Sequence, residues 1–155
     1  SAQKSLQYLK NNGLDKEVID FYHSGKPILG ICLGAQMFCK NLYENGFSKG
    51  MGILDYDVVK INEMFKNVQL NIGWFELSNL EIKNLKEFNK IKKKYFYFCH
   101  QYFMKANKIR ETEEVDYKDF SIPAIIKKNN LIICQFHPEK SQENGEKFLL
   151  DFINL

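Results

Sequence analysis

The sequence predicts an α/β or α+β layered domain, and three observations support this fold class. Stretches with helical spacing of apolar residues are mixed along the chain with short apolar stretches typical of buried strands. A strand, a tight turn and a helix are expected to meet at Cys32. The 155 residues are 45% hydrophobic and 14% aromatic, which is enough apolar side chain for one packed core. We therefore expect a single domain over residues 1–155.

Two helices are expected before the first strand. Leu6, Leu9 and Leu14 mark the first helical stretch. Asp15 is a candidate N-cap for a second helix, which Gly25 would end.

A short buried strand is expected over residues 26–31, followed by a helix over residues 33–44. Asn45 and Gly46 follow directly and are typical of a helix C-terminus, because both residue types tolerate positive φ.

Beyond Gly52 the sequence favours strands and ends in a helix. Strands are expected over residues 57–61, 69–74, 95–99, 122–126 and 131–136. Asn129 and Asn130 lie between the last two strands and predict a hairpin turn. Residues 142–153 carry their apolar side chains on one helical face and predict the final helix.

Composition excludes several classes of protein. The net charge of +3 is too small to indicate nucleic acid or an anionic membrane as a partner. No apolar run approaches the roughly 18–20 residues of a spanning helix, and residues 1–4 do not resemble a signal peptide. The four cysteines form no C-x-x-C pair, so we expect no metal site, no cofactor and no disulfide framework. Free thiols are typical of a cytoplasmic protein.

The first chemical motif is a candidate nucleophile elbow, Gly30-Ile31-Cys32-Leu33-Gly34. A strained turn between strand and helix lifts the sulfur clear of the sheet, and the two glycines avoid collisions with neighbouring backbone. We expect the helix N-terminus to lower the pKa of the Cys32 thiol, and the Leu33 N–H to donate to an oxyanion. On the pattern alone, the alternative is a tight turn with an inert buried thiol.

A thiol nucleophile needs a base, and His137 is the best candidate. His23 falls in a polar helical stretch and is expected at the surface, whereas His137 follows a buried strand. Pro138 would stop that strand, and the Glu139 carboxylate could hold the imidazole in one orientation. Cys32, His137 and Glu139 would then be nucleophile, base and orienting group. The alternative is that His137 is an ordinary histidine at a strand end.

With both motifs in place, the chain resembles the class I, triad-type glutamine amidotransferases. The resemblance is carried by residues 25–36 and 135–142. Within this family it is most similar to the glutaminase subunits of imidazole glycerol phosphate synthases, through residues 50–54, 72–74, 100–102 and 140–142. The resemblance implies a flavodoxin-like open sheet flanked by helices, with an additional antiparallel β portion.

The resemblance also implies a reaction. Cys32 would attack the side-chain amide of L-glutamine, and His137 would protonate the departing ammonia and then activate water against the thioester. The ammonia would pass through a tunnel to a partner synthase, a cyclase subunit with a (β/α)8 barrel in the most similar relatives. The resemblance thus implies a cytoplasmic heterodimer that acts in histidine biosynthesis.

Three residues are implied as substrate-binding. Gln36 matches a residue that holds glutamine, and it lies four residues after Cys32 on the same face of the expected helix. Without the resemblance, a buried amide that bonds backbone is an equal alternative for Gln36. Gln101 and Tyr102 match a loop that contacts the substrate through backbone groups.

The chain departs from the family in three places. Family members carry about fifty further residues before the position of Ser1, with the first strands of the layered sheet and a loop that supplies a second oxyanion donor. Gln101 stands where a serine is usual, and Asn71 where a histidine is usual. The departures at Gln101 and Asn71 leave open a paralogue that supplies ammonia to a sugar-modifying synthetase for surface polysaccharide, and the first departure leaves open a non-catalytic truncated homologue that acts as a binding partner. A cysteine peptidase on the same elbow is a third alternative, against which Gln36 and residues 137–142 argue.

Overall fold

The computed structural model describes residues 1–64, 71–78, 80–107, 112–117 and 122–155, and it shows a mixed α/β protein. In chain order its elements are α1 (Ala2–Asn11), α2 (Leu14–His23), β1 (Ile28–Ile31), α3 (Leu33–Met37), β2 (Cys39–Leu42), β3 (Ser48–Lys49), β4 (Leu54–Lys60), α4 (Ile61–Met64), β5 (Asn71–Glu76), α5 (Lys86–Asn89), β6 (Tyr95–His100), β7 (Tyr102–Ala106), β8 (Glu113–Asp116), β9 (Pro123–Lys128), β10 (Leu131–Cys134), the 3-10 helix η1 (Pro138–Lys140) and α6 (Gln142–Ile153). Among the described helices, none has the length and apolar character needed to cross a membrane.

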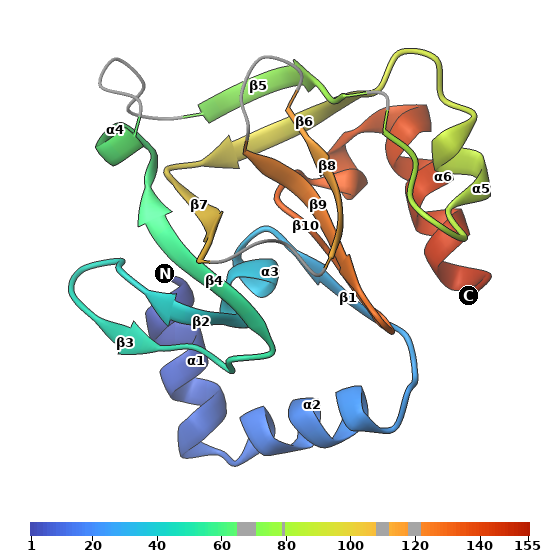
Figure 1. Cartoon of the computed structure of the whole chain (residues 1–155). Helices are drawn as coiled ribbons and strands as arrows, with labels where there is room; N and C mark the ends of the chain where they lie inside the picture. Colours follow the sequence, from blue (N-terminus) through green and yellow to red (C-terminus); the bar gives the residue numbers. More distant parts are fainter. Residues whose placement is uncertain (65–70, 79, 108–111, 118–121) are drawn as a thin grey trace.

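The strands form three sheets (Figure 1). The first has the order β1-β10-β9-β8, in which β1 is parallel to β10 and the remaining pairs are antiparallel. The second has the order β3-β2-β4-β7, and β5 and β6 form an antiparallel pair of their own. The parallel register places Ile31 opposite Cys134, so β1 and β10 end at the same edge.

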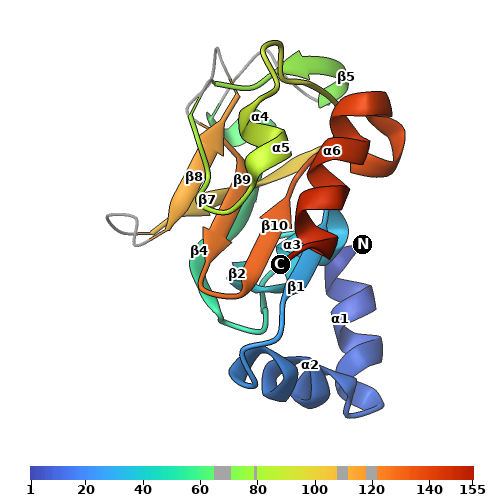
Figure 2. The ribbon, with the colours of Figure 1, turned by 90° about the vertical axis from the view of Figure 1, so that its right-hand side faces the viewer.

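Both faces of β10 are buried, which explains its continuous apolar sequence. Ile132 and Cys134 belong to a core with the aromatic rings of Phe96, Phe98 and Phe136. Leu131 and Ile133 belong to a second core with Ala35, Leu42 and Leu54. Figure 2 shows α1, α3 and α6 along one side of the molecule and β4, β7, β8 and β9 along the other. The edge where β1 and β10 end is therefore held rigidly between two cores.

Several expectations about secondary structure are confirmed. The final helix runs from Gln142 to Ile153 as the apolar spacing predicts, and the hairpin between β9 and β10 turns at Asn129 with a φ of 54°. The predicted cap of the second helix is wrong. That helix begins at Leu14 with Gly13 at its N-cap position and a φ of 72°, so Asp15 lies inside the first turn. Of the strand expected over 69–74, residues 69 and 70 lie outside the described residues, and β5 covers Asn71–Glu76.

The helix predicted over residues 33–44 begins at Leu33 as expected, but its predicted length is wrong, because the chain leaves the helix after Met37 and forms β2. The segment that follows β3 takes the carbonyls that a longer helix would use: Gly52 N–H donates to the Cys39 carbonyl at 3.1 Å. A Cβ at Gly50 would lie 1.9 Å from that same oxygen, so this close approach requires glycine.

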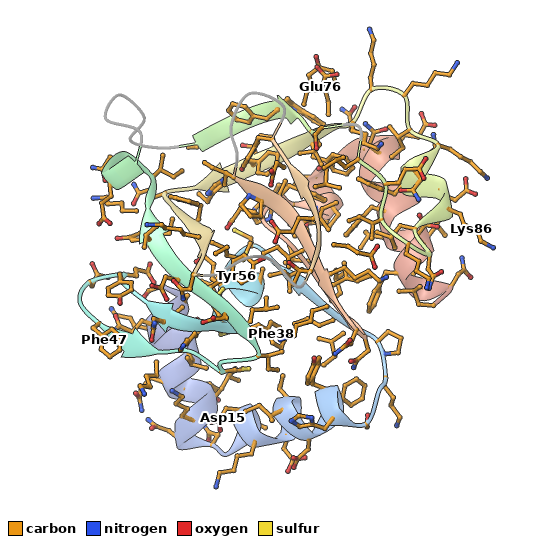
Figure 3. All side chains as sticks on the ribbon, viewed as in Figure 1. Asp15, Phe38, Phe47, Tyr56, Glu76 and Lys86 are labelled. Carbon is orange, nitrogen blue, oxygen red and sulfur yellow. The ribbon has the colours of Figure 1, made fainter. Side chains whose placement is uncertain are left out.

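Asn45 and Gly46, expected as a helix end, instead form the turn between β2 and β3, with φ of 59° and 106°. Figure 3 shows Phe38 where α3 passes into β2, and Phe47 on the turn. Phe38 is buried and Phe47 is exposed, as expected for a core position and a hairpin tip.

Candidate active site

The elbow at Cys32 is a strained bend between β1 and α3. Cys32 has a φ of 48° and a ψ of −107°, a conformation that residues with a side chain rarely adopt. Its N–H donates to the Cys134 carbonyl at 2.8 Å, and its own carbonyl accepts from the Gln36 N–H at 3.2 Å. The bend is thus fixed from both sides, by the neighbouring strand and by the first turn of α3.

The two glycines of the elbow play different parts. A Cβ at Gly30 would lie 2.9 Å from Ile133 Cγ2 and 3.0 Å from Ala35 Cα, so the packing of α3 against the sheet requires glycine there. A Cβ at Gly34 would meet nothing within 4 Å. The expectation that flanking glycines prevent collisions is confirmed for Gly30 and wrong for Gly34.

The ionisation of the Cys32 thiol is governed mainly by burial. Burial raises the pKa of the thiol above its ordinary value, and the nearby Cys99 and Glu139 raise it further. The Leu33 N–H and the Gln135 amide act in the opposite direction but do not outweigh burial. The expected lowering of the pKa is therefore wrong, because burial outweighs the Leu33 N–H at the start of α3. A base must take the proton from this thiol.

His137 is held against Glu139 by the turn that follows β10. The His137 N–H donates to the Tyr97 carbonyl at 2.8 Å, and Ser141 Oγ donates to the His137 carbonyl at 2.6 Å. His137 Nδ1 lies 2.7 Å from Glu139 Oε1. With Nδ1–H donating to the carboxylate, Nε2 carries the lone pair and can act as a base.

The sheet topology brings the nucleophile and the base to one edge. Cys32 directly follows β1, and His137 lies three residues after Cys134 at the end of the adjacent parallel strand. The Cys32 N–H bonds the Cys134 carbonyl, and Glu139 lies near enough for its charge to raise the pKa of Cys32. The carboxyl edge of parallel strands is where α/β sheets commonly bind ligands.

A pocket of about 210 Å³ opens at this edge. Its lining residues are Ala2, Cys32, Leu33, Gln36, Glu44, Cys99, His100, Gln101 and Tyr102. The pocket thus contains the expected nucleophile, the expected oxyanion donor and the three expected substrate-binding residues, whereas His137 and Glu139 do not line it. Pockets for drug-sized ligands span about 300–1,000 Å³, so this one suits a ligand of amino-acid size.

Gln36 is bonded within the protein. It is 7% exposed, and its Nε2 donates to the Tyr102 carbonyl at 3.1 Å and to Gln135 Oε1 at 3.2 Å. This arrangement matches the alternative of a buried amide that bonds backbone, although the residue still lines the pocket. Gln101 is exposed, and its backbone carbonyl accepts from the Ile61 N–H at 2.9 Å.

Sequence reasoning missed two polar residues at the site. Glu44, expected only as a helix end, lines the pocket, where its Oε2 accepts from Ser1 Oγ at 2.8 Å. Its position depends on how α1 packs, which no local pattern indicates. Gln135 has no exposed surface, and its Nε2 lies 3.7 Å from Cys32 Sγ. An amide inside the apolar stretch 131–136 was the signal that could have identified it.

His100 forms a buried wall of the pocket. Its Nδ1 lies 2.8 Å from the Tyr102 carbonyl and its Nε2 lies 2.5 Å from Tyr117 Oη. Burial lowers the pKa of His100 to about 4, so the ring is neutral at neutral pH. Nδ1 therefore donates to the carbonyl, and Nε2 accepts from the tyrosine hydroxyl.

Comparison with known proteins places these features in a family. The model of the class I glutamine amidotransferase family matches residues 9–155. The imidazole glycerol phosphate synthase subunit HisH of Caldanaerobacter subterraneus subsp. tengcongensis is 36% identical over 150 residues, which cover 96% of this chain and 71% of that protein. Subunit HisH 1 of Campylobacter jejuni (strain RM1221) is 38% identical over 131 residues, which cover 84% of this chain and 64% of that protein. The chain thus spans about two thirds of the length of these relatives.

Solved structures show the same fold. A crystal structure of a glutamine amidotransferase has a TM-score of 0.71 at 16% identity, over 100% of this chain and 76% of that one. Another glutamine amidotransferase, from Thermotoga maritima, has a TM-score of 0.62 at 18% identity, over 99% of this chain and 58% of that one. The predicted open sheet flanked by helices, with its antiparallel portion, is confirmed.

Proposed function

The chain belongs to the class I glutamine amidotransferase family, and we propose from this premise that it hydrolyses L-glutamine to glutamate and ammonia through a thioester on Cys32. One observation carries the proposal. The strained Cys32 opens into a pocket of amino-acid size, at the same sheet edge as an imidazole fixed by a carboxylate.

Acylation begins with proton transfer. His137 Nε2 takes the proton of the Cys32 thiol, and the sulfur attacks the side-chain carbonyl carbon of glutamine. The oxygen of the tetrahedral intermediate accepts from the Leu33 N–H. His137 then gives its proton to the leaving nitrogen, and ammonia departs as the thioester forms. Glu139 would hold the imidazole in one orientation and tautomer through its bond to Nδ1, which leaves Nε2 for proton transfer.

Deacylation repeats the proton transfers with water. His137 Nε2 takes a proton from a water molecule, whose oxygen attacks the thioester carbonyl. The carbon–sulfur bond breaks, Cys32 recovers its proton, and glutamate leaves the pocket.

The pocket supplies groups that suit the polar end of an amino acid. The Glu44 carboxylate lines it and would pair with the α-ammonium group of glutamine. Gln101 and Tyr102 border the same space and would contact the substrate through backbone groups. Gln36 would complete the lining on the α3 side.

We further propose that the ammonia passes to a partner synthase subunit with a (β/α)8 barrel, in a heterodimer of histidine biosynthesis. The names of the relatives support this assignment. On β5, Ile72 and Trp74 are 49% and 45% exposed, and we propose that they contact the partner. The paralogue that supplies a sugar-modifying synthetase would use the same chemistry with a different partner.

The test measures glutamate release by the protein alone and with a cyclase subunit, together with covalent labelling by a glutamine-mimicking electrophile. We expect an adduct on Cys32, turnover that Cys32→Ala abolishes, and stimulation by the cyclase. Cys99→Ser is the matched control, because it alters another thiol of the pocket. An unlabelled Cys32 and no glutamate release in any combination would favour a non-catalytic binding partner.

The pH profile is a second readout. Because turnover depends on transfer of a proton from Cys32 to His137, glutaminase activity should fall on the acid side as the reactive form of this pair is lost. A profile that is flat from neutral to acid pH would contradict this pair.

A further inference from the structure

A chain of side-chain amides leads from the protein backbone to the sulfur of Cys32. Gln36 Nε2 donates to the Tyr102 carbonyl at 3.1 Å and to Gln135 Oε1 at 3.2 Å. Gln135 Nε2 in turn donates to Cys32 Sγ at 3.7 Å. The proposed reaction mechanism leaves Gln135 without a role.

The direction of this amide chain follows from hydrogen-bond chemistry. The Tyr102 carbonyl can only accept, so the Gln36 group that faces it must be the NH2. That same NH2 also faces Gln135, which must present its oxygen in return. The Gln135 NH2 is therefore the group that faces the sulfur, and the amide cannot rotate without losing its bond to Gln36.

The backbone of Gln135 is fixed as firmly as its side chain. Its N–H donates to the Ala124 carbonyl at 2.9 Å, and the residue has no exposed surface. Cys32, one strand away, is held by the Cys134 carbonyl. Donor and sulfur thus belong to neighbouring rigid positions of one sheet edge.

We propose that Gln135 is a positioning residue for the glutaminase reaction: its amide N–H holds the sulfur of Cys32 and stabilises its ionised form. This proposal rests on the proposed function. A donor is needed because Cys32 is partly buried and lies near Cys99 and Glu139, which both oppose a negative charge on the sulfur. Gln36 acts in the same chain by holding Gln135, in addition to lining the pocket.

Two variants distinguish a role of Gln135 as a hydrogen-bond donor from a role in packing alone. Gln135→Met keeps the approximate volume and removes the N–H donor. Gln135→Glu keeps the shape and the acceptor for Gln36 but directs an oxygen at the sulfur. Carbamidomethylation by iodoacetamide is followed from pH 6 to 10 in the wild type and both variants, with each cysteine quantified by mass spectrometry.

We expect the apparent pKa of Cys32 alkylation to rise in both variants. The rate at pH 7 should fall about threefold to tenfold in Gln135→Met, as expected for the loss of one ordinary hydrogen bond, and further in Gln135→Glu. In glutamate release, kcat should fall by a similar factor while KM changes less than about twofold, because substrate contacts remain.

The two buried cysteines serve as internal controls. Cys39 and Cys134 should stay unreactive in the wild type and in both variants. An unchanged Cys32 profile in either variant that stays folded overturns the proposal. Reactive Cys39 and Cys134 in both variants also overturns it, because Gln135 would then hold the fold and not the sulfur.

The outcome is distinguishable from a failure of the proposed function. Alkylation requires no substrate, so a shifted Cys32 profile in a protein that releases no glutamate would reject the glutaminase while the effect of Gln135 on the sulfur stood. An unshifted profile in an active glutaminase would reject the role of Gln135 alone.

Discussion

Two histidines stand at neighbouring positions of the fold and have opposite surroundings. His100 ends β6, is 6% exposed, and is bonded by both ring nitrogens to the Tyr102 carbonyl and the Tyr117 hydroxyl. The His137 side chain is 20% exposed, and its Nδ1 meets the half-exposed carboxylate of Glu139. The segments that carry them are joined where the His137 N–H donates to the Tyr97 carbonyl of β6.

The difference shows how the fold divides one residue type between structure and chemistry. Burial keeps the His100 ring neutral although the Tyr102 carbonyl favours the charged form, and both of its nitrogens are already bonded. A carboxylate on Nδ1 of His137 leaves Nε2 for proton transfer and stabilises the imidazolium that forms. Changes at His137 should therefore alter turnover, and changes around His100 should alter stability.

The largest effect is expected at His137. In His137→Asn no group can take the Cys32 proton, so kcat for glutamate release should fall about 10⁴-fold or more. The free energy of unfolding should change little, because the backbone bonds of this turn do not involve the ring. Turnover and urea unfolding are measured on the same preparation, with Cys32→Ala as the inactive reference. A variant that keeps a tenth of the activity would remove His137 from the mechanism.

A smaller loss is expected at Glu139. Glu139→Gln keeps an oxygen for Nδ1–H but removes the charge that stabilises the imidazolium, and its NH2 can select the wrong tautomer. Because this carboxylate is half exposed, we expect kcat to fall about 10-fold to 100-fold, less than for His137→Asn. Glu143→Gln is a matched control, since Glu143 is an exposed carboxylate nearby that pairs with Lys147. Equal losses in the Glu139 and His137 variants would contradict a purely orienting role.

How much of this contrast could be predicted from sequence differs between the two histidines. The His137 motif is local: a buried strand, a proline that ends it and a carboxylate two residues on. Those features predicted that Glu139 would contact the ring, and the structure places it there. The His100 site depends on Tyr117, which is far along the chain and meets the ring only after the sheets assemble.

The same distinction explains the errors around the elbow. The bend at Cys32 follows from a local glycine pattern, but the length of α3 does not. α3 ends at Met37 because the following residues pair with β4 as strand β2, and because the N–H groups of residues 50–52 bond the carbonyls that a longer helix would use. Both are tertiary contacts. Glu44 and Gln135 were missed for the same reason, since each meets the pocket or the sulfur through a neighbour distant in sequence.

Burial of His100 should make the free energy of unfolding depend on pH. The pKa of His100 is about 4 in the folded protein and 6.5 ordinarily, so between these values the unfolded chain binds a proton that the folded chain does not. The contribution of His100 to the free energy of unfolding is fully present above about pH 6.5. It is lost as pH falls towards 4, by up to about 1.4 kcal/mol per pH unit.

His100→Asn should lower the free energy of unfolding at pH 7 by about 2 kcal/mol, because Asn is too short to reach both partners. The gap from wild type should narrow as pH falls from 6.5 to 4, since the variant lacks the titrating ring. Urea unfolding at pH 7, 6 and 5 measures both effects. A gap that is the same at all three values would show that His100 is not held neutral.

The smallest effect is expected from a change at Tyr117, whose hydroxyl bonds the His100 ring. Tyr117→Phe removes the hydroxyl that donates to His100 Nε2 but keeps the ring that packs 4.4 Å from Phe98, centroid to centroid. We expect the free energy of unfolding at pH 7 to fall by about 1 kcal/mol, the usual net value of one buried hydrogen bond, with turnover retained. Tyr95→Phe is the control, because its exposed hydroxyl donates to Glu76 at 3.2 Å and should contribute close to nothing. If Tyr117→Phe instead lost turnover at unchanged stability, His100 would belong with His137 in the chemistry and the division between the two histidines would fail.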